Sequence, residues 1–295
     1  MTVSGSSDVY FKSTETGNTI TLAENHVNSA FEFEGLLGEW TLQDSIHVSS
    51  VKVNEGVLNT NGNSIRANSF SALNTSTVNL SSTNIYIYSG GSVINSPNFD
   101  AGTSSIFLRL YGGNFVGSSA WNSYTSQVNN LIIESTNISQ IRGDGGSFSK
   151  IEQRGTGVPV LNDNITADSI IVVAGKTLEL SGTITVNDYL EMNGTCSLLP
   201  TLTGTGILSS VTGNIVVNHT NIENITATGG ASFVANNSYD LGGNIGWTIN
   251  STSAKDYYWV GDGGSWEDGS HWALTSGGPG SGCVPTFQDN VYFDA

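Results

Sequence analysis

Apolar residues recur along this chain in pairs that enclose a single residue. The clearest stretch runs from Val172 to Met192, where a new pair begins every six residues. The four pairs are Val172/Ala174, Leu178/Leu180, Ile184/Val186 and Leu190/Met192. Alternation with a period of two predicts short half-buried strands. Because such strands are too short to be stable alone, they indicate a solenoid in which each coil stacks on the next.

Similar short strands are predicted along most of the chain, with Gly, Asn, Ser or Asp in almost every gap. They are Val51-Lys52-Val53, Ile65-Arg66-Ala67, Thr77-Val78-Asn79-Leu80, Asn84-Ile85-Tyr86-Ile87-Tyr88, Ile106-Phe107-Leu108, Leu131-Ile132-Ile133 and Ile215-Val216-Val217. These gap residues supply the left-handed and Asx-turn conformations of tight corners. We therefore predict an all-β fold, a parallel β-helix, over residues 1–254.

The expected dimensions follow from the strand spacing. Coils of roughly 18 to 24 residues give about 10 to 13 coils and, at about 4.8 Å per coil, a rod of roughly 50–60 Å. A right-handed coil is favoured, although the six-residue spacing between 172 and 192 also suits a left-handed triangular helix. A pair of β-sandwiches is the alternative, but it needs longer alternating strands and more hairpin turns.

The last forty residues have a different composition. Trp259, Trp266 and Trp272 fall within fourteen positions and are followed by a Gly-rich turn. Three tryptophans provide compact burial where a coil cannot close. We interpret residues 255–289 as a small Trp- and Gly-rich insert or cap that shields the unpaired strand edges of the rod's C-terminal end.

The two ends of the chain resemble each other. Ser7-Asp8-Val9-Tyr10-Phe11 is echoed by Asp289-Asn290-Val291-Tyr292-Phe293. We interpret residues 290–295 as the start of a next repeat, so that the sequence is one period of a tandem array. Its first residues lack the basic and apolar regions of a signal peptide, and the export signal of an extracellular protein is expected outside the residues shown.

Charge and hydropathy narrow the classes of partner. The chain has 25 acidic and 9 basic residues, a formal net charge of −16. Phosphate backbones and anionic membrane surfaces would be repelled, so nucleic-acid binding is not expected. No apolar run is long enough to span a bilayer, and direct membrane insertion is not expected either.

Two segments, 228–247 and 257–295, resemble a recurrent part of giant repeat-containing cell-surface adhesins of Bacteroidetes, with the gliding-motility adhesins of Flavobacterium-like bacteria as the nearest match. The residues that carry the resemblance are Thr228-Gly229-Gly230-Ala231-Ser232-Phe233, Asn237-Ser238, Asp240-Leu241-Gly242-Gly243-Asn244-Ile245-Gly246-Trp247, Tyr257-Tyr258-Trp259-Val260-Gly261, Ser265-Trp266, His271-Trp272, Val284-Pro285-Thr286 and Asp289-Asn290-Val291-Tyr292-Phe293-Asp294-Ala295. The resemblance implies type IX secretion, an extracellular location at the cell surface, adhesion to polysaccharide or substratum, and gliding motility. It implies neighbouring repeats of the same chain as partners and no catalytic residues.

Three classes of function stay open: an adhesive module, a passive spacer, and a polysaccharide-active β-helix enzyme. The enzyme hypothesis depends on Arg142, Lys150 and Arg154, which lie near Asp144 and Glu152 in the sequence and could form a lyase-like site. Local ion pairs in a solvated loop are the favoured interpretation. No nucleophile elbow, phosphate-binding loop or dinucleotide fingerprint occurs, and we predict a non-enzymatic protein.

Aromatic residues outside the insert are candidates for sugar stacking. Trp121 with Tyr124, in a polar stretch, is the best pair, and Tyr86 and Tyr88 share one face of a predicted strand. Packing or an exposed loop is the simpler explanation. The four histidines lack metal-ligand spacing and are interpreted as turn or packing residues.

Calcium is the only cofactor considered. Asp262, Glu267 and Asp268 lie in a Gly-rich loop of the insert and offer hard oxygen ligands, but no EF-hand spacing is present, and turn formation is the simpler role. Cys196 and Cys283 match no zinc spacing. They form a possible disulfide that would pin the insert to the last coils of the rod.

Overall fold

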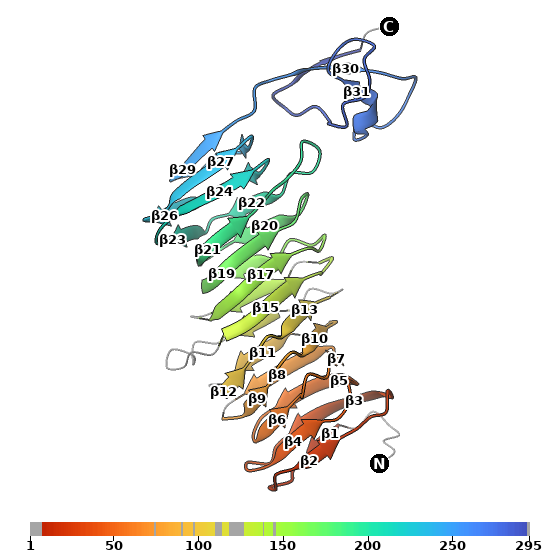
Figure 1. Cartoon of the computed structure of the whole chain (residues 1–295), viewed down its shortest axis with the longest axis vertical. Coiled ribbons are helices and arrows are strands. Elements are labelled where there is room, and N and C mark those ends of the chain that lie inside the picture. Colours follow the sequence, from red (N-terminus) through yellow and green to blue (C-terminus); the bar gives the residue numbers. More distant parts are fainter. Residues whose placement is uncertain are drawn as a thin grey trace.

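The chain forms a β-solenoid of about ten turns built from stacked parallel strands. The computed structural model describes residues 8–293 apart from 74, 90, 97, 110–113, 118–126, 138 and 144–145, and only the backbone of 114–117 and 127. Over this part the rod is elongated, with the N-terminal turns at one end and a small separate sheet at the other (Figure 1). The all-β parallel β-helix predicted from the sequence is confirmed. Within the described residues no helix has the length and apolarity needed to cross a membrane.

Each turn contains about three short strands, and the longest strands bend around a corner to serve two faces. The principal sheet contains β1 (Val9–Phe11), β3 (His26–Phe33), β5 (Ile46–Val53), β7 (Ile65–Ala67), β8 (Ser69–Leu73), β10 (Asn84–Ile87), β11 (Ser92–Asn95), β13 (Ser105–Leu108), β14 (Asn114–Gly117), β15 (Gln127–Ile133), β16 (Gln140–Gly143), β17 (Ser147–Gln153), β18 (Val160–Asn162), β19 (Asn164–Val172), β20 (Thr177–Leu180), β21 (Thr183–Glu191), β22 (Thr201–Gly204), β23 (Ile207–Ser210), β25 (Asn221–Ile222), β26 (Thr226–Gly229) and β28 (Tyr239–Asp240). A second sheet contains β2 (Asn18–Ile20), β4 (Glu39–Leu42), β6 (Val57–Asn59), β9 (Thr77–Asn79) and β12 (Asn98–Asp100). A third contains β24 (Asn214–Asn218), β27 (Ser232–Asn236) and β29 (Trp247–Asn250).

A continuous ladder of apolar side chains fills the interior along one column of strands. Its members align in register from turn to turn and are all buried: Ile65, Ile85, Ile106, Leu131, Ile151, Ile170 and Leu190. The separation between partners varies, because 106 − 85 is 21 residues whereas 131 − 106 is 25. The strands are therefore regular and the corners absorb the differences in length.

Polar side chains form their own ladders at the corners. Asn79 donates from Nδ2 to Asn59 Oδ1 at 2.6 Å, and Asn59 donates to Glu39 Oε1 at 2.7 Å, so three consecutive turns are linked. Inside the rod, Thr60 and Thr83 are fully buried with their hydroxyl oxygens 2.5 Å apart. Because a buried polar group is costly without a partner, stacking of like residues explains the chain's many Asn, Ser and Thr residues.

A small three-stranded sheet follows the solenoid. It consists of β30 (Asp256–Trp259), β31 (Trp272–Ala273) and β32 (Asn290–Tyr292), with a 3-10 turn η2 (Gly269–His271). The Trp272 side chain is fully buried and its ring centroid lies 5.0 Å from Trp259 and 4.6 Å from Trp266. We call residues 255–293 the C-terminal module.

Candidate functional site

Five outward-facing residues form a column along the N-terminal half of the rod. They are His26 on β3, His47 on β5, Arg66 on β7, Tyr86 on β10 and Phe107 on β13, and each is aligned with the next. Their neighbours along the strands point inward and are buried, so strand alternation sends these side chains outward. Adjacent members lie on strands about 4.8 Å apart. We call this set the aromatic–cationic column.

The column members contact one another. The rings of His26 and His47 stack with centroids 3.8 Å apart, and those of Tyr86 and Phe107 with centroids 4.9 Å apart. The Arg109 guanidinium, just after β13, lies 4.5 Å from the Tyr86 ring centroid. The Arg66 guanidinium lies 5.7 Å from the same centroid. Two cations thus flank one aromatic stack, an arrangement stabilised by the negative faces of the rings.

A groove runs beside the column. Its volume is about 440 Å³, and it is lined by His26, Asn28, His47, Val48, Ser49, Ala67, Asn68 and Tyr88. The Tyr88 side chain and the histidine pair therefore share one concave surface. Polar and aromatic groups alternate around it, as is typical of sites that bind polyhydroxylated ligands.

Charge along the column is set by local partners. Partial burial, then the positive neighbours His26 and Arg66, lower the pKa of His47. The opposite effect acts on Arg109: burial alone would lower its pKa, but hydrogen bonds with Glu134 and Tyr88 raise it overall. At neutral pH the positive charge of the column therefore resides on Arg66 and Arg109 rather than on the histidine pair.

The basic residues proposed as a lyase-like cluster lie further along the rod. Lys150 Nζ lies 3.2 Å from Glu152 Oε2, and Arg154 Nε donates to Glu152 Oε1 at 2.5 Å. Burial would raise the pKa of Glu152, but the hydrogen bonds from Arg154 and Lys150 lower it overall. Arg142 lies on a different strand, β16, and Asp144 lies outside the described residues. Lys150 and Arg154 are thus held in local ion pairs.

One of these pairs connects the two regions. Glu134, which follows β15, accepts a hydrogen bond from Arg109 Nε at 2.7 Å and lies 3.9 Å from Arg154 Nη1. Arg109, Glu134 and Arg154 belong to consecutive turns. The column therefore continues into a ladder of alternating charge.

The predicted sugar-stacking pair Trp121 and Tyr124 lies outside the described residues. The calcium candidates lie in the C-terminal module and are all exposed. Asp268 accepts hydrogen bonds from Ser270 N at 2.9 Å and Ser270 Oγ at 2.7 Å, which makes it the N-cap of η2. In the part of the chain that the structure describes, no three His, Cys, Asp or Glu side chains converge as a metal-ligand set, and Asp262, Glu267 and Asp268 are not brought together.

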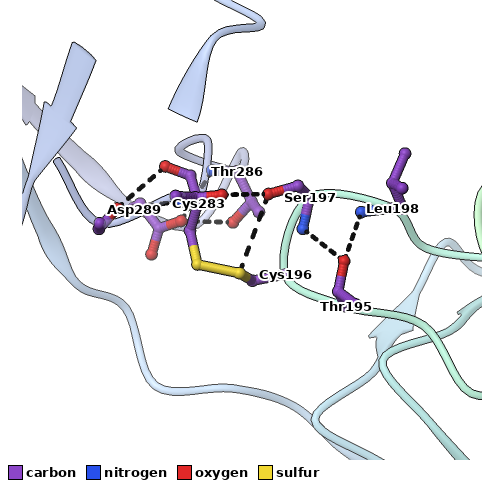
Figure 2. The surroundings of a disulfide bond; sticks show 9 residues. Thr195, Cys196, Ser197, Leu198, Cys283, Thr286 and Asp289 are labelled. Carbon is purple, nitrogen blue, oxygen red and sulfur yellow. Dashed lines mark hydrogen bonds between the residues drawn. A yellow bond between two sulfur atoms is a disulfide. The ribbon is translucent and has the colours of Figure 1, made fainter. Parts of the chain in front are cut away.

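Cys196 and Cys283 are joined in a disulfide, with Cα atoms 5.4 Å apart (Figure 2). This is the pairing given above as a possible bridge. Cys196 lies in the loop between β21 and β22, and Cys283 lies in the C-terminal module. Beside the bridge, Ser197 Oγ donates to Gly282 O at 2.7 Å. The module is therefore attached covalently to a turn of the rod.

The aromatic–cationic column was not predicted from the sequence. Its members are separated by 21, 19, 20 and 21 residues (47 − 26, 66 − 47, 86 − 66 and 107 − 86). These separations equal one coil length, so a search for polar or aromatic residues at the coil spacing was the available signal. The histidines were judged by the short spacings of metal sites, which a solenoid does not use.

Comparison of the chain with family models, with curated proteins and with solved structures gave no match.

Proposed function

We propose that this chain is a non-enzymatic repeat segment of a long extracellular surface adhesin, and that it attaches to acidic polysaccharide through the aromatic–cationic column. The observation that carries the proposal is the alignment of His26, His47, Arg66, Tyr86 and Phe107 on one outward face. A role in gliding motility and secretion by the type IX route are supported only by the resemblance of the C-terminal segments to such adhesins.

The chemistry of the column favours a sugar acid over a neutral sugar. Aromatic rings such as Tyr86 and Phe107 offer flat apolar faces for sugar rings. Guanidinium groups such as Arg66 bind carboxylates with two parallel hydrogen bonds. In a chain of net charge −16, a local pair of cations beside a groove is a specific feature. A linear polymer would lie along the column, because the side chains repeat at the strand spacing.

Two other functions were weighed. A lyase needs a basic residue free to remove a proton, whereas Lys150 and Arg154 are paired with Glu152. A passive spacer needs only stiffness, which the stacked core and corner ladders favour. The aromatic–cationic column has no role in a spacer, and for that reason adhesion is preferred.

The test is depletion of the purified chain from solution by insoluble cross-linked polygalacturonate and by cellulose, each with calcium and with a chelator. We expect retention on the acidic polymer only. Tyr86→Ala and Arg66→Gln should each weaken retention at least about fivefold, roughly 1 kcal/mol. Tyr189→Ala and Arg142→Gln are matched controls, because Tyr189 is 46% exposed on β21 and Arg142 is exposed on β16.

Each outcome separates the three functions. Retention that the column variants do not reduce would exclude the column as the site, and Trp121→Ala in the same assay tests the other candidate. No retention on either polymer would favour a spacer. Release of unsaturated products from polygalacturonate would favour a lyase. Retention that the chelator abolishes would revive the calcium hypothesis and point to Asp262, Glu267 and Asp268.

A further inference from the structure

Two strands at opposite ends of the molecule have the same sequence but different partners. Val9, Tyr10 and Phe11 form β1, which pairs in parallel with β3 in the first turn of the solenoid. Val291 and Tyr292 belong to β32, followed by Phe293, and β32 pairs in parallel with β30 in the C-terminal module. The two strands lie at the red and blue ends of Figure 1.

The two pairings use opposite edges of the strand. Phe11 O accepts a hydrogen bond from Glu34 N at 2.9 Å, so the backbone groups of Val9 and Phe11 point toward β3. Asn290 N donates to Lys255 O at 2.8 Å, so those of Asn290 and Tyr292 point toward β30. Along a strand, successive residues point their N–H and C=O groups to alternate sides.

Aligning Val9 with Val291 shows that the two sets do not overlap. The backbone groups that β1 directs to β3 are those of positions 9 and 11, equivalent to 291 and 293 (291 − 9 and 293 − 11 are both 282). In β32 the groups of 291 and 293 point away from β30. A single strand of this sequence therefore has the hydrogen-bonding groups to pair with β30 on one edge and with β3 on the other.

The side chains are compatible with both partners. Phe11 packs against the solenoid core, with its ring stacked on Phe33 at 4.6 Å. The equivalent Phe293 lies 5.9 Å from Trp259 and 5.8 Å from Trp272, yet it is 67% exposed. Both phenylalanines thus lie against aromatic clusters, and in the module that cluster covers only part of the ring.

The first turn also has an uncovered apolar surface. A cavity of about 580 Å³ at this end of the rod is lined by Val9, Phe11, Thr19, Ile20, Thr21, Leu22, Asn25, His26, Val27 and Phe31. Strand edges and apolar surface of this kind are normally covered by a partner. The surface beside β1 is where a module paired through the same strand would lie.

We propose that consecutive copies of this repeat share one strand: Val291-Tyr292-Phe293 is both the last strand of one copy's C-terminal module and the first strand of the next copy's solenoid. The partner of each end is therefore a second copy of this chain, joined by strand addition. This inference rests on the tandem organisation in the proposed function and is independent of polysaccharide binding.

The test compares two fused chains by amide hydrogen exchange. In the shared-strand chain, residues 1–293 of one copy run directly into residue 12 of a second copy, so that one Val-Tyr-Phe segment must serve both. In the control chain, a flexible Gly/Ser linker joins residue 293 to residue 8 of the second copy, which keeps its own β1. We expect the Phe293 amide to exchange at least about tenfold more slowly in the shared-strand chain.

The Tyr292 amide is the internal control, because it points toward β30 and should be protected equally in both fusions. Equal exchange of Phe293 in the two fusions would overturn the proposal. So would a second solenoid that fails to fold, or that melts earlier, in the shared-strand chain. Retention of the single chain on polygalacturonate is a separate measurement, so the two proposals fail independently.

Discussion

Single glycines fix the path of the chain where one turn crosses the next. Gly204, at the end of β22, has a φ of +123°, a conformation that side chains with a Cβ rarely adopt. An added Cβ would lie 2.1 Å from the carbonyl oxygen of Leu180 in the turn below. That oxygen accepts hydrogen bonds from Thr205 N and Gly206 N at 3.0 and 2.9 Å, so it cannot move without breaking the corner.

Gly204→Ala should therefore lower the free energy of unfolding by about 1–3 kcal/mol. Gly146→Ala is the matched control, because its backbone lacks a positive φ and an added Cβ would have its nearest neighbour at 3.6 Å. Its effect should stay within about 0.5 kcal/mol. Urea denaturation with an unchanged m-value measures both. Equal destabilisation by the two substitutions would contradict the role assigned to Gly204.

The stacked histidine pair makes stability depend on pH. Burial, His26 and Arg66 lower the pKa of His47 in the folded protein below its ordinary value of about 6.5. The unfolded chain then binds the proton more readily, so stability is full above about pH 6.5 and falls as the pH drops through the lower folded-state pKa. Thermal midpoints at pH 7 and pH 5 should differ less in His47→Gln than in the natural sequence. The same difference in both proteins would exclude His47 as the cause.

Secondary-structure elements in this molecule are too short to be stable outside the stack. β7 has three residues with the pattern buried, exposed, buried, and it is held only by β5 and β10 on either side. This alternation is visible in the sequence. Seven of the eight residues in the pairs between Val172 and Met192 are buried, while Ala174 is half-buried. Strand positions and inward residues could therefore be predicted from local pattern alone.

The register between turns could not be predicted in the same way. Corners differ in length, as the separations of 21 and 25 residues on either side of Ile106 show, and nothing local fixes them. Any functional site on a solenoid face depends on that register, since its members come from different turns. For this reason Arg66 and Tyr86 were each visible in the sequence, but their alignment with His47 and Phe107 was not.

At the scale of the whole molecule, the rod and the C-terminal module are joined by a few contacts around one covalent link. Tyr239 OH donates to Thr286 Oγ1 at 3.2 Å, and the rings of Tyr239 and Phe287 lie 5.4 Å apart. Residues 251–255, which connect the two parts, are mostly exposed. The Cys196–Cys283 bridge spans 87 residues of sequence and joins the module to the loop after β21. A pull applied through the module therefore reaches the rod through the bridge as well as through the connecting segment.

Replacement of both cysteines by serine should loosen the module from the rod. In the chain-entropy account, closing a loop of this length stabilises by up to about 4–5 kcal/mol. The double variant should melt in two steps, with the module first, and trypsin should cut earlier at Lys255. Ser197→Ala is the matched control, because it removes only the hydrogen bond to Gly282 O, worth about 0.5–1.5 kcal/mol. If the double variant melts in one step at an unchanged temperature, the noncovalent contacts around Tyr239 are sufficient to hold the module, and the bridge is not what transmits force between module and rod.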